Sequence, residues 1–273
     1  MHIDSDDLRY YAECRENRIN SKTRRRQELS DKFSEAMSHQ EVTLGIPSGK
    51  SLQEPVLHAL KRAGITVDVH HPRQILAPVR GLRFLDRVAL CAPSVMPALI
   101  SAGIVPFGLT GSDTVGEFDD FDSDTEECNA TLEICAEFPL SKTTANKTRA
   151  VMFVRENDAV TDMESLMRLV GSEQPIHVAT EYSRATIKFL WKYGIRGNLF
   201  CVRGSAETFV LLGHFRFGVA LTETGETLQQ NGLRIIGELF ESGTALVANR
   251  AFTDLPAGKE LVRKLTERLN AVL

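Results

Sequence analysis

The segment 221–228, which reads LTETGETL, combines hydroxyl side chains with a glycine. Its hydroxyls come from Thr222, Thr224 and Thr227. Because Gly225 has no Cβ, backbone N–H groups at this position can approach the oxygens of an anion closely. These features favour a cradle for a phosphate group. A plain strand-to-helix turn capped by threonines has the same composition, so the composition alone leaves both interpretations open.

Elements on either side must hold this segment in place. Residues 217–221 form a buried-strand pattern directly before it, and ligands of α/β sheets bind at the carboxyl ends of strands, where helix N-termini offer N–H groups to anions. Other strand patterns cover residues 42–47, 65–69, 88–91, 104–109, 131–138, 149–154, 176–180, 198–202 and 245–248. Helix patterns cover residues 52–64, 95–102, 182–193 and 259–273. This alternation predicts an α/β protein of two lobes with a cleft between them.

Two charged segments stand outside this alternation. Residues 5–40 favour a helix with sparse apolar positions, and acidic side chains offset basic ones such as the run Arg24, Arg25 and Arg26. We expect a solvated helical arm that packs on the body or on another subunit, rather than an arm that binds nucleic acid. Residues 117–127 are mostly acidic, and we expect a flexible loop there, because their spacing does not fit a calcium loop.

The composition excludes several classes of partner. The chain has 273 residues, 42% of them apolar, and a net charge of −4, so it lacks the broad positive field that nucleic acid or an acidic membrane surface attracts. The sequence contains no apolar run of roughly eighteen residues, and its N-terminus is polar and acidic, so we expect a cytoplasmic protein. Its five cysteines contain no C-x-x-C pair and are expected to be reduced thiols.

Five ordered motifs resemble one enzyme family. Residues 224–233 match the pattern T-G-x-T-L-x-x-N-G-L, the phosphoribosyl-diphosphate loop of ATP phosphoribosyltransferases. The other matching segments are 46–52 (IPSGKSL), 108–113 (GLTGSD), 179–182 (ATEY) and 204–207 (GSAE). The resemblance covers roughly residues 42–273 and depends on the order and spacing of the segments rather than on any one motif.

The resemblance implies a fold of two lobes related to type II periplasmic binding proteins. It divides the chain into an N-terminal helical extension (1–40), lobe I (41–145 with 234–273) and lobe II (146–233). It also implies a Mg²⁺-dependent displacement in which N1 of the ATP adenine attacks C1 of phosphoribosyl diphosphate and pyrophosphate leaves. The chain resembles the short form of the family. We therefore expect ATP or a related purine nucleotide as substrate and a homo-oligomer, with or without a regulatory subunit.

Site residues carry over from the matching motifs. The resemblance implies that the 5′-phosphate is held by Thr222, Thr224, Gly225, Glu226, Thr227 and Leu228. It assigns the nucleotide or diphosphate to Ser48, Gly49, Thr110 and Tyr182. Catalytic roles fall to Lys50, Glu207 and Glu223, the last as a carboxylate near the ribose. The residues that would hold the metal are not implied.

The chain departs from the family pattern at several polar positions. Ala220, Arg216 and Pro106 each stand where an acidic residue is usual, and residues 90–93 (LCAP) replace an R-x-x-D-I-P type stretch. Each lost hydrogen-bonding partner of a polar ligand costs about 1–3 kcal/mol. The departures leave two interpretations open, an enzyme whose acceptor pocket has changed and a non-catalytic binding or regulatory subunit on the same scaffold.

Overall fold

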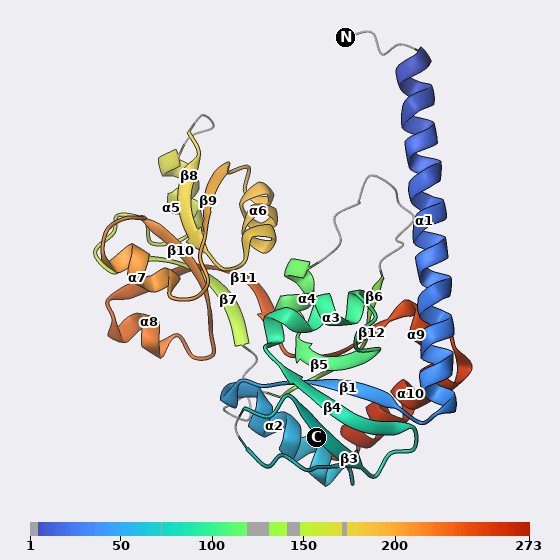
Figure 1. Ribbon diagram of the computed structural model, residues 1–273. Helices are drawn as coiled ribbons and strands as arrows, with labels where there is room; N and C mark the ends of the chain where they lie inside the picture. Colours follow the sequence, from blue (N-terminus) through green and yellow to red (C-terminus); the bar gives the residue numbers. More distant parts are fainter. Residues whose placement is uncertain (1–4, 72, 119–130, 141–147, 171–173) are drawn as a thin grey trace.

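The computed structural model describes residues 5–71, 73–118, 131–140, 148–170 and 174–273. Two α/β lobes and one long helix make up the described chain (Figure 1). Each lobe is built around its own sheet, and the long helix runs along lobe I and then extends away from it. No helix in the described part is long and apolar enough to cross a membrane.

Lobe I is built on a mixed sheet. Its described strands are β1 (Val42–Pro47), β2 (Thr66–Val67), β3 (Leu76–Arg80), β4 (Leu85–Cys91), β5 (Phe107–Gly111), β6 (Leu132–Phe138) and β12 (Thr244–Asn249). Their order is β2-β3-β4-β1-β5-β12-β6. β1 pairs in parallel with both β4 and β5, whereas β12 is antiparallel to β5 and β6. The carboxyl ends of β1, β4 and β5 therefore meet at one edge of the sheet.

Helices cover both faces of this sheet. They are α2 (Lys50–Arg62), the 3₁₀ turn η1 (Pro93–Val95), α3 (Met96–Ser101), α4 (Ser112–Phe118), α9 (Arg250–Thr253) and α10 (Pro256–Asn270). The helix pattern expected at residues 259–273 corresponds to α10, whose Leu261, Leu265 and Leu269 are buried in the lobe I core, whereas Leu273 lies beyond the helix and is exposed. Apolar side chains at this helical spacing drive α10 onto the sheet.

Lobe II has a smaller sheet with the order β11-β7-β10-β8-β9. Its strands are β7 (Thr148–Arg155), β8 (Ile176–Thr180), β9 (Gly197–Cys201), β10 (Phe217–Thr222) and β11 (Leu233–Ser242). Its helices are α5 (Met163–Val170), α6 (Ser183–Lys192), α7 (Ala206–Leu211) and α8 (Glu226–Gln230). β8 runs parallel to β9 and β10, and β7 is antiparallel to β10 and β11.

Strand β11 corrects the expected division of the chain. Lobe II was expected to end at residue 233, but β11 pairs with β7 from Leu233 through Ser242, so the chain returns to lobe I only at Gly243 and β12. The pattern of β11 lacks the strict alternation of a half-buried strand, and its pairing shifts register at two places. For these reasons the sequence pattern did not reveal the strand.

Helix α4 corrects a second expectation. Glu117 was expected in a flexible loop, yet it lies in the last turn of α4. The remainder of that acidic segment, residues 119–127, lies outside the described residues. Strand β3 and helix α5 were also not expected from the sequence. Short elements of this kind owe their stability to packing rather than to local propensity.

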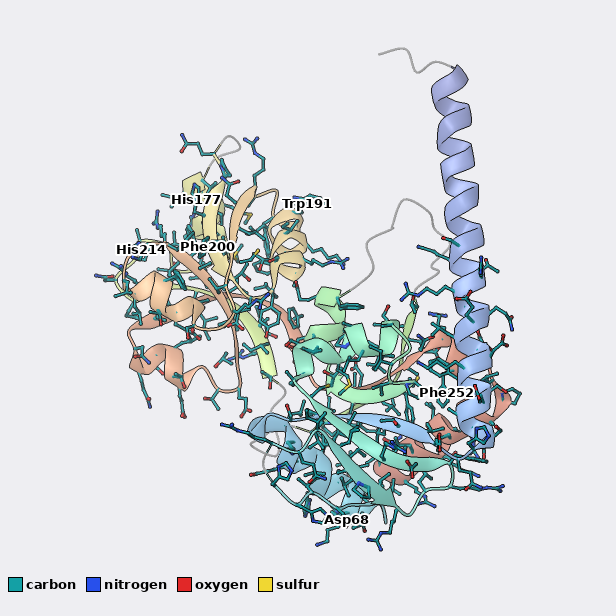
Figure 2. All side chains as sticks on the ribbon, viewed as in Figure 1. Asp68, His177, Trp191, Phe200, His214 and Phe252 are labelled. Atoms are coloured by element: carbon teal, nitrogen blue, oxygen red, sulfur yellow. The ribbon has the colours of Figure 1, made fainter. Side chains whose placement is uncertain are left out.

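The long helix α1 (Ser5–Ser38) confirms the expected helical arm. Its C-terminal third packs on lobe I, where Phe33 is 3% exposed and Met37 is 6% exposed. The Phe33 ring meets the edge of Phe252, a residue of α9 at the base of the helix, with ring centroids 5.5 Å apart (Figure 2). Arg26 pairs with Asp254 at 2.6 Å. The N-terminal part of α1 projects beyond both lobes (Figure 1).

Replacing Phe33 by Ala tests how firmly α1 is docked. We expect Phe33→Ala to lower the free energy of unfolding by about 3 kcal/mol, because it removes a buried aromatic ring and leaves a cavity. Ser34→Ala is the matched control, since Ser34 is the exposed neighbour on the same helix, and its effect should stay within about 0.5 kcal/mol. Denaturant unfolding measures both variants. Equal stability of Phe33→Ala and the unchanged chain would contradict the docking.

Candidate phosphoribosyl-diphosphate site

The segment 221–228, in which we expect a phosphate site, lies at the junction of the two lobes. In lobe II, Thr222 at the end of β10 pairs with Arg149 near the start of β7, where the chain has just arrived from lobe I. In lobe I, Gly111 at the end of β5 pairs with Thr244, the first residue of β12 after the return. The carboxyl ends of the parallel strands in both sheets therefore face the two crossings. This is the position at which α/β sheets bind ligands.

The loop between β10 and α8 is organised by its own hydroxyls. Thr222 Oγ1 accepts a hydrogen bond from the Gly225 N–H at 2.9 Å, and Thr224 Oγ1 accepts one from the Glu226 N–H at 3.2 Å. Gly225 has a φ of 83°, in the left-handed region that favours glycine. These bonds hold the turn that starts α8. The N–H groups of the first turn of a helix lack partners within the helix and attract anions.

The expected ligands of the 5′-phosphate differ in their access to solvent. Thr224, Glu226 and Thr227 are exposed, so their side chains are available to a ligand. The Leu228 side chain is 3% exposed and packs in the lobe II core, which leaves only its backbone N–H for a phosphate. Glu223 is half-buried in the same loop. Thr224 thus both holds the turn and faces outward, whereas Leu228 anchors the loop in the core.

Tyr182 forms a second part of the site, after the end of β8. Thr180 is fully buried, and its Oγ1 accepts a hydrogen bond from the Tyr182 N–H at 2.9 Å. The Tyr182 hydroxyl donates to Asp113 Oδ2 of α4 across the lobe boundary at 3.3 Å. Burial, followed by the negative charge of Asp113, raises the pKa of Tyr182, so its hydroxyl stays protonated and acts as a donor.

Carboxylates gather around this tyrosine. The pKa of Glu181 is raised, first because its carboxylate is partly removed from water and then because Glu207 and Asp113 add negative charge. The backbone N–H of Gly204 opposes this shift by hydrogen bonding to Glu181. Glu207, expected to be catalytic, is half-buried in the first turn of α7. Glu181 thus lies within the electrostatic influence of Glu207, and Tyr182 within that of Glu181 and Asp113.

The described residues contain no group of three or more His, Cys, Asp or Glu side chains that could hold a metal ion. Mg²⁺ is commonly held by one or two carboxylates together with substrate phosphates rather than by a protein cage. The carboxylates near Tyr182 fit that mode of binding. Burial raises the pKa of the Cys91 thiol, and that of Cys135 to about 12, so these two side chains stay protonated near neutral pH.

In lobe I, the expected diphosphate residues follow β1. Ser48 is exposed, and its N–H donates to the Cys91 carbonyl at the end of β4 at 2.8 Å. Gly49 is the N-cap of α2, and a Cβ added there would meet nothing within 4 Å. A ligand can therefore approach this backbone closely. Lys50 begins α2, but its side chain lies outside the described residues.

The expected contact of Thr110 with the nucleotide is wrong for this structure. Thr110 is fully buried in β5. Its hydroxyl donates to the Pro93 carbonyl at 3.0 Å and lies 3.1 Å from the Thr114 hydroxyl. Thr110 thus joins β5 to η1 and α4. Sequence reasoning also missed Asp113 and Glu181, although both belong to the matching segments and that membership was the available signal.

Two of the departures from the family pattern lie away from the site. Arg216 precedes β10 and Pro106 precedes β5, so each stands at the amino end of its strand, opposite the edge that faces the crossings. Ala220 is different, because it lies two residues before the end of β10. It is 2% exposed and packs in the core beneath the loop, among residues that include Leu228 and Ala206.

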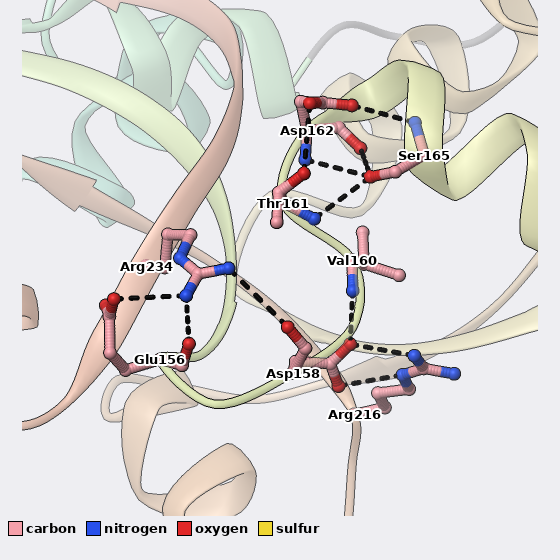
Figure 3. Close-up of polar contacts among 8 residues, drawn as sticks. All are labelled: Glu156, Asp158, Val160, Thr161, Asp162, Ser165, Arg216 and Arg234. Atoms are coloured by element: carbon pink, nitrogen blue, oxygen red, sulfur yellow. Dashed lines mark hydrogen bonds and ion pairs between the residues drawn. The ribbon is translucent and has the colours of Figure 1, made fainter.

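Arg216 belongs to a separate polar network at the far end of lobe II (Figure 3). Its Nε and Nη2 donate to the two carboxylate oxygens of Asp158 at 2.9 and 2.7 Å. Arg234 donates to Glu156 in the same network. Hydrogen bonding by Arg216 is the main cause of the lowered pKa of Asp158. The arginine that replaces the usual acidic residue is thus part of the scaffold.

A cavity of about 800 Å³ lies between the lobes, on a different side of the connecting strands from the loop after β10. It is lined by α4, α6, β6 and β11, and it contains none of the expected site residues. Figure 1 places α4 and α6 to the right of the connecting strands β7 and β11, whereas α8 lies to their left. The cavity is therefore separate from the loop after β10.

Comparison with known proteins agrees with this geometry. The family model described as HisG, ATP phosphoribosyltransferase, matches residues 92–271 of the chain. The chain belongs to the ATP phosphoribosyltransferase family. An ATP phosphoribosyltransferase of Nitratidesulfovibrio vulgaris (strain DP4) is 30% identical over 232 residues, which cover 85% of this chain and 72% of the relative. One of Methanococcus maripaludis (strain C5) is 26% identical over 85% of this chain and 73% of the relative.

Solved structures confirm the fold. The chain is similar to the ATP phosphoribosyl transferase (HisG:HisZ) complex from Thermotoga maritima with a TM-score of 0.63, at 23% identity over 85% of this chain and 98% of that chain. It is also similar to a putative periplasmic sulfonate-binding protein from Methylobacillus flagellatus, with a TM-score of 0.51 and 14% identity over 84% of this chain and 67% of that chain. The two-lobed architecture of periplasmic binding proteins is therefore shared, as expected.

Removing the Arg216 guanidinium tests whether this position serves stability alone. We expect Arg216→Ala to lower the free energy of unfolding by about 1–2 kcal/mol at pH 7, because it leaves the largely buried Asp158 carboxylate without its main partner. The folded-state pKa of Asp158 is lowered, so the contribution is present above the unfolded pKa of about 3.9. It should disappear as the pH falls through the lower folded value.

The control for this variant is Arg168→Ala, which removes an exposed ion pair of the same lobe and should change stability by less than about 0.5 kcal/mol. Unfolding at several pH values measures both variants. In Arg216→Ala the KM for phosphoribosyl diphosphate should be unchanged. A raised KM at unaltered stability would place Arg216 at the ligand instead of in the scaffold.

Proposed function

We propose that this chain condenses ATP with phosphoribosyl diphosphate and releases pyrophosphate, the first step of histidine biosynthesis. The observation that carries the proposal is the loop 222–228 at the junction of the lobes, in a chain that belongs to the ATP phosphoribosyltransferase family. In this reaction a bond forms between N1 of adenine and C1 of the ribose. The bond between C1 and the diphosphate oxygen breaks, and pyrophosphate leaves with its electron pair.

The residues act mainly by binding and orientation. Holding the two reactants in line converts a bimolecular step into an effectively unimolecular one, which accounts for a large share of the rate increase. The loop binds the 5′-phosphate through its exposed hydroxyls and the N–H groups that begin α8. We assign the diphosphate to Ser48 and Gly49 of lobe I together with Lys50, which begins α2. We assign the ribose hydroxyls to Glu223, because Ala220 has no carboxylate to meet them.

Mg²⁺ is the cofactor we propose. When bound, it would supply charge neutralisation on the departing diphosphate. Glu207 and Glu181 are the carboxylates we propose to share it with the substrate phosphates. A related purine nucleotide is the second acceptor to test, because residues 90–93, which span the end of β4 and the turn after it, lack the charged residues of the family pattern.

The surroundings of the enzyme are also part of the proposal. We propose that the chain works in the cytoplasm, as expected for an enzyme of amino-acid biosynthesis. We also propose a homo-oligomer. A regulatory subunit of the kind named in the Thermotoga maritima HisG:HisZ complex is a candidate second partner.

An activity assay tests the reaction directly. Protein mixed with Mg²⁺, ATP and phosphoribosyl diphosphate should produce the ultraviolet absorbance of phosphoribosyl-ATP, and chelation of the metal should abolish it. Omission of phosphoribosyl diphosphate is the control. If calorimetry shows that the diphosphate binds but ATP yields no product, other purine nucleotides are tested as acceptors. If neither substrate binds, the alternative of a non-catalytic subunit replaces the proposal.

Replacing Gly225 tests the loop. We expect Gly225→Ala to raise the KM for phosphoribosyl diphosphate at least tenfold, because alanine disfavours the left-handed backbone and its Cβ would lie 3.1 Å from Ile235 Cδ1. Gly194→Ala is the matched control: Gly194 has a φ of 68° with open space around it, and it lies at the far end of α6. The control should lose similar stability and keep its KM. A raised KM in both variants would argue against a specific role of the loop.

A further inference from the structure

Helix α4 carries two carboxylates, Asp113 and Glu117, which lie four residues apart and therefore on one helix face. Asp113 Oδ1 accepts a hydrogen bond at 2.7 Å from the hydroxyl of Ser242, the last residue of β11 before the return to lobe I. Its Oδ2 accepts one from the Tyr182 hydroxyl of lobe II at 3.3 Å. Asp113 thus joins α4 both to a crossing and to lobe II.

Glu117 makes a second connection, to the N-terminus of α6. Its Oε2 accepts a hydrogen bond from the Arg184 N–H at 3.2 Å, and its Oε1 accepts one from the Ala185 N–H at 3.0 Å. The first N–H groups of a helix lack partners within it, and the helix dipole favours negative charge there. The N-cap residue Tyr182 supplies no side-chain cap. A carboxylate of lobe I therefore caps a helix of lobe II.

We propose that Glu117 is a positioning residue that, with Asp113, clasps the two lobes in the arrangement that binds phosphoribosyl diphosphate. This inference rests on the proposed function. Helix α6 begins directly after β8, at the same sheet edge as the phosphate loop after β10. Fixing the start of α6 to α4 therefore fixes that loop relative to Ser48 and Gly49 of lobe I.

The clasp acts on affinity more than on the chemical step. If the clasped arrangement is only partly populated, the apparent dissociation constant of the substrate rises in inverse proportion to that population. Saturating substrate restores the arrangement, because it contacts both lobes. The loss of Glu117 should thus raise KM and leave kcat nearly unchanged. A general loss of folded protein would do the opposite, because it lowers kcat at constant KM.

Substitutions of Glu117 test the clasp kinetically. We expect Glu117→Ala to raise the KM for phosphoribosyl diphosphate about tenfold with kcat within about twofold. Glu117→Gln keeps one acceptor oxygen but loses the charge, and its KM should rise about threefold. Glu137→Ala is the control. Glu137 is an exposed carboxylate of lobe I that lines the cavity between the lobes, as Glu117 does, but it has no role in the clasp. An unchanged KM, or a loss of kcat alone, in Glu117→Ala overturns the proposal.

A measurement without catalysis separates this inference from the proposed function. Spin labels on unnatural amino acids at Glu54 of α2 and Gln230 of α8, both exposed, report the distance between the lobes by pulsed dipolar spectroscopy. Without substrate, Glu117→Ala should shift and broaden the distance distribution, because the lobes are no longer held in one arrangement, and Glu137→Ala should not. Identical distributions for Glu117→Ala and the unchanged chain overturn the clasp. The result stands even if the chain proves inactive with ATP.

Discussion

The antiparallel pairing of β7 with β11 is the interaction on which the rest of the structure depends. These strands are the two that meet the lobe boundary in lobe II, and residues 150–154 of β7 are fully buried. Because β10 lies along the other edge of β7, the end of β10 is fixed beside the crossing. The phosphate loop therefore gains its position between the lobes from backbone pairing that its own residues do not provide.

Some polar atoms of the loop 222–228 are already engaged in hydrogen bonds within the loop itself. Two of its hydroxyls, those of Thr222 and Thr224, accept hydrogen bonds from N–H groups of the loop itself. These bonds fix the turn before a ligand arrives, so less conformational entropy is lost on binding. Such preorganisation also explains the left-handed Gly225, whose backbone conformation would be strained for other residues.

The departures from the family pattern fall into two groups. Some lie at the amino end of a strand, and others lie toward the carboxyl end. Arg216 and Pro106 replace acidic residues at the amino ends of β10 and β5, where Arg216 pairs with Asp158 and the Pro106 carbonyl accepts from Asn249. Substitutions at these amino ends therefore affect the scaffold of the lobes. Ala220 and residues 90–93 lie toward the carboxyl ends of β10 and β4, at the sheet edges where the proposed site lies.

The sequence by itself determined the fold class and the helical arm, because periodic apolar patterns are local signals, and it placed a glycine-threonine turn after the strand 217–221. It also carried the family motifs, including Asp113 and Glu181. Only the tertiary structure decided that β11 belongs to lobe II, that Thr110 is buried, and that Glu117 caps a helix of the other lobe. Those facts depend on pairing and packing between residues far apart in the chain, which no local pattern records.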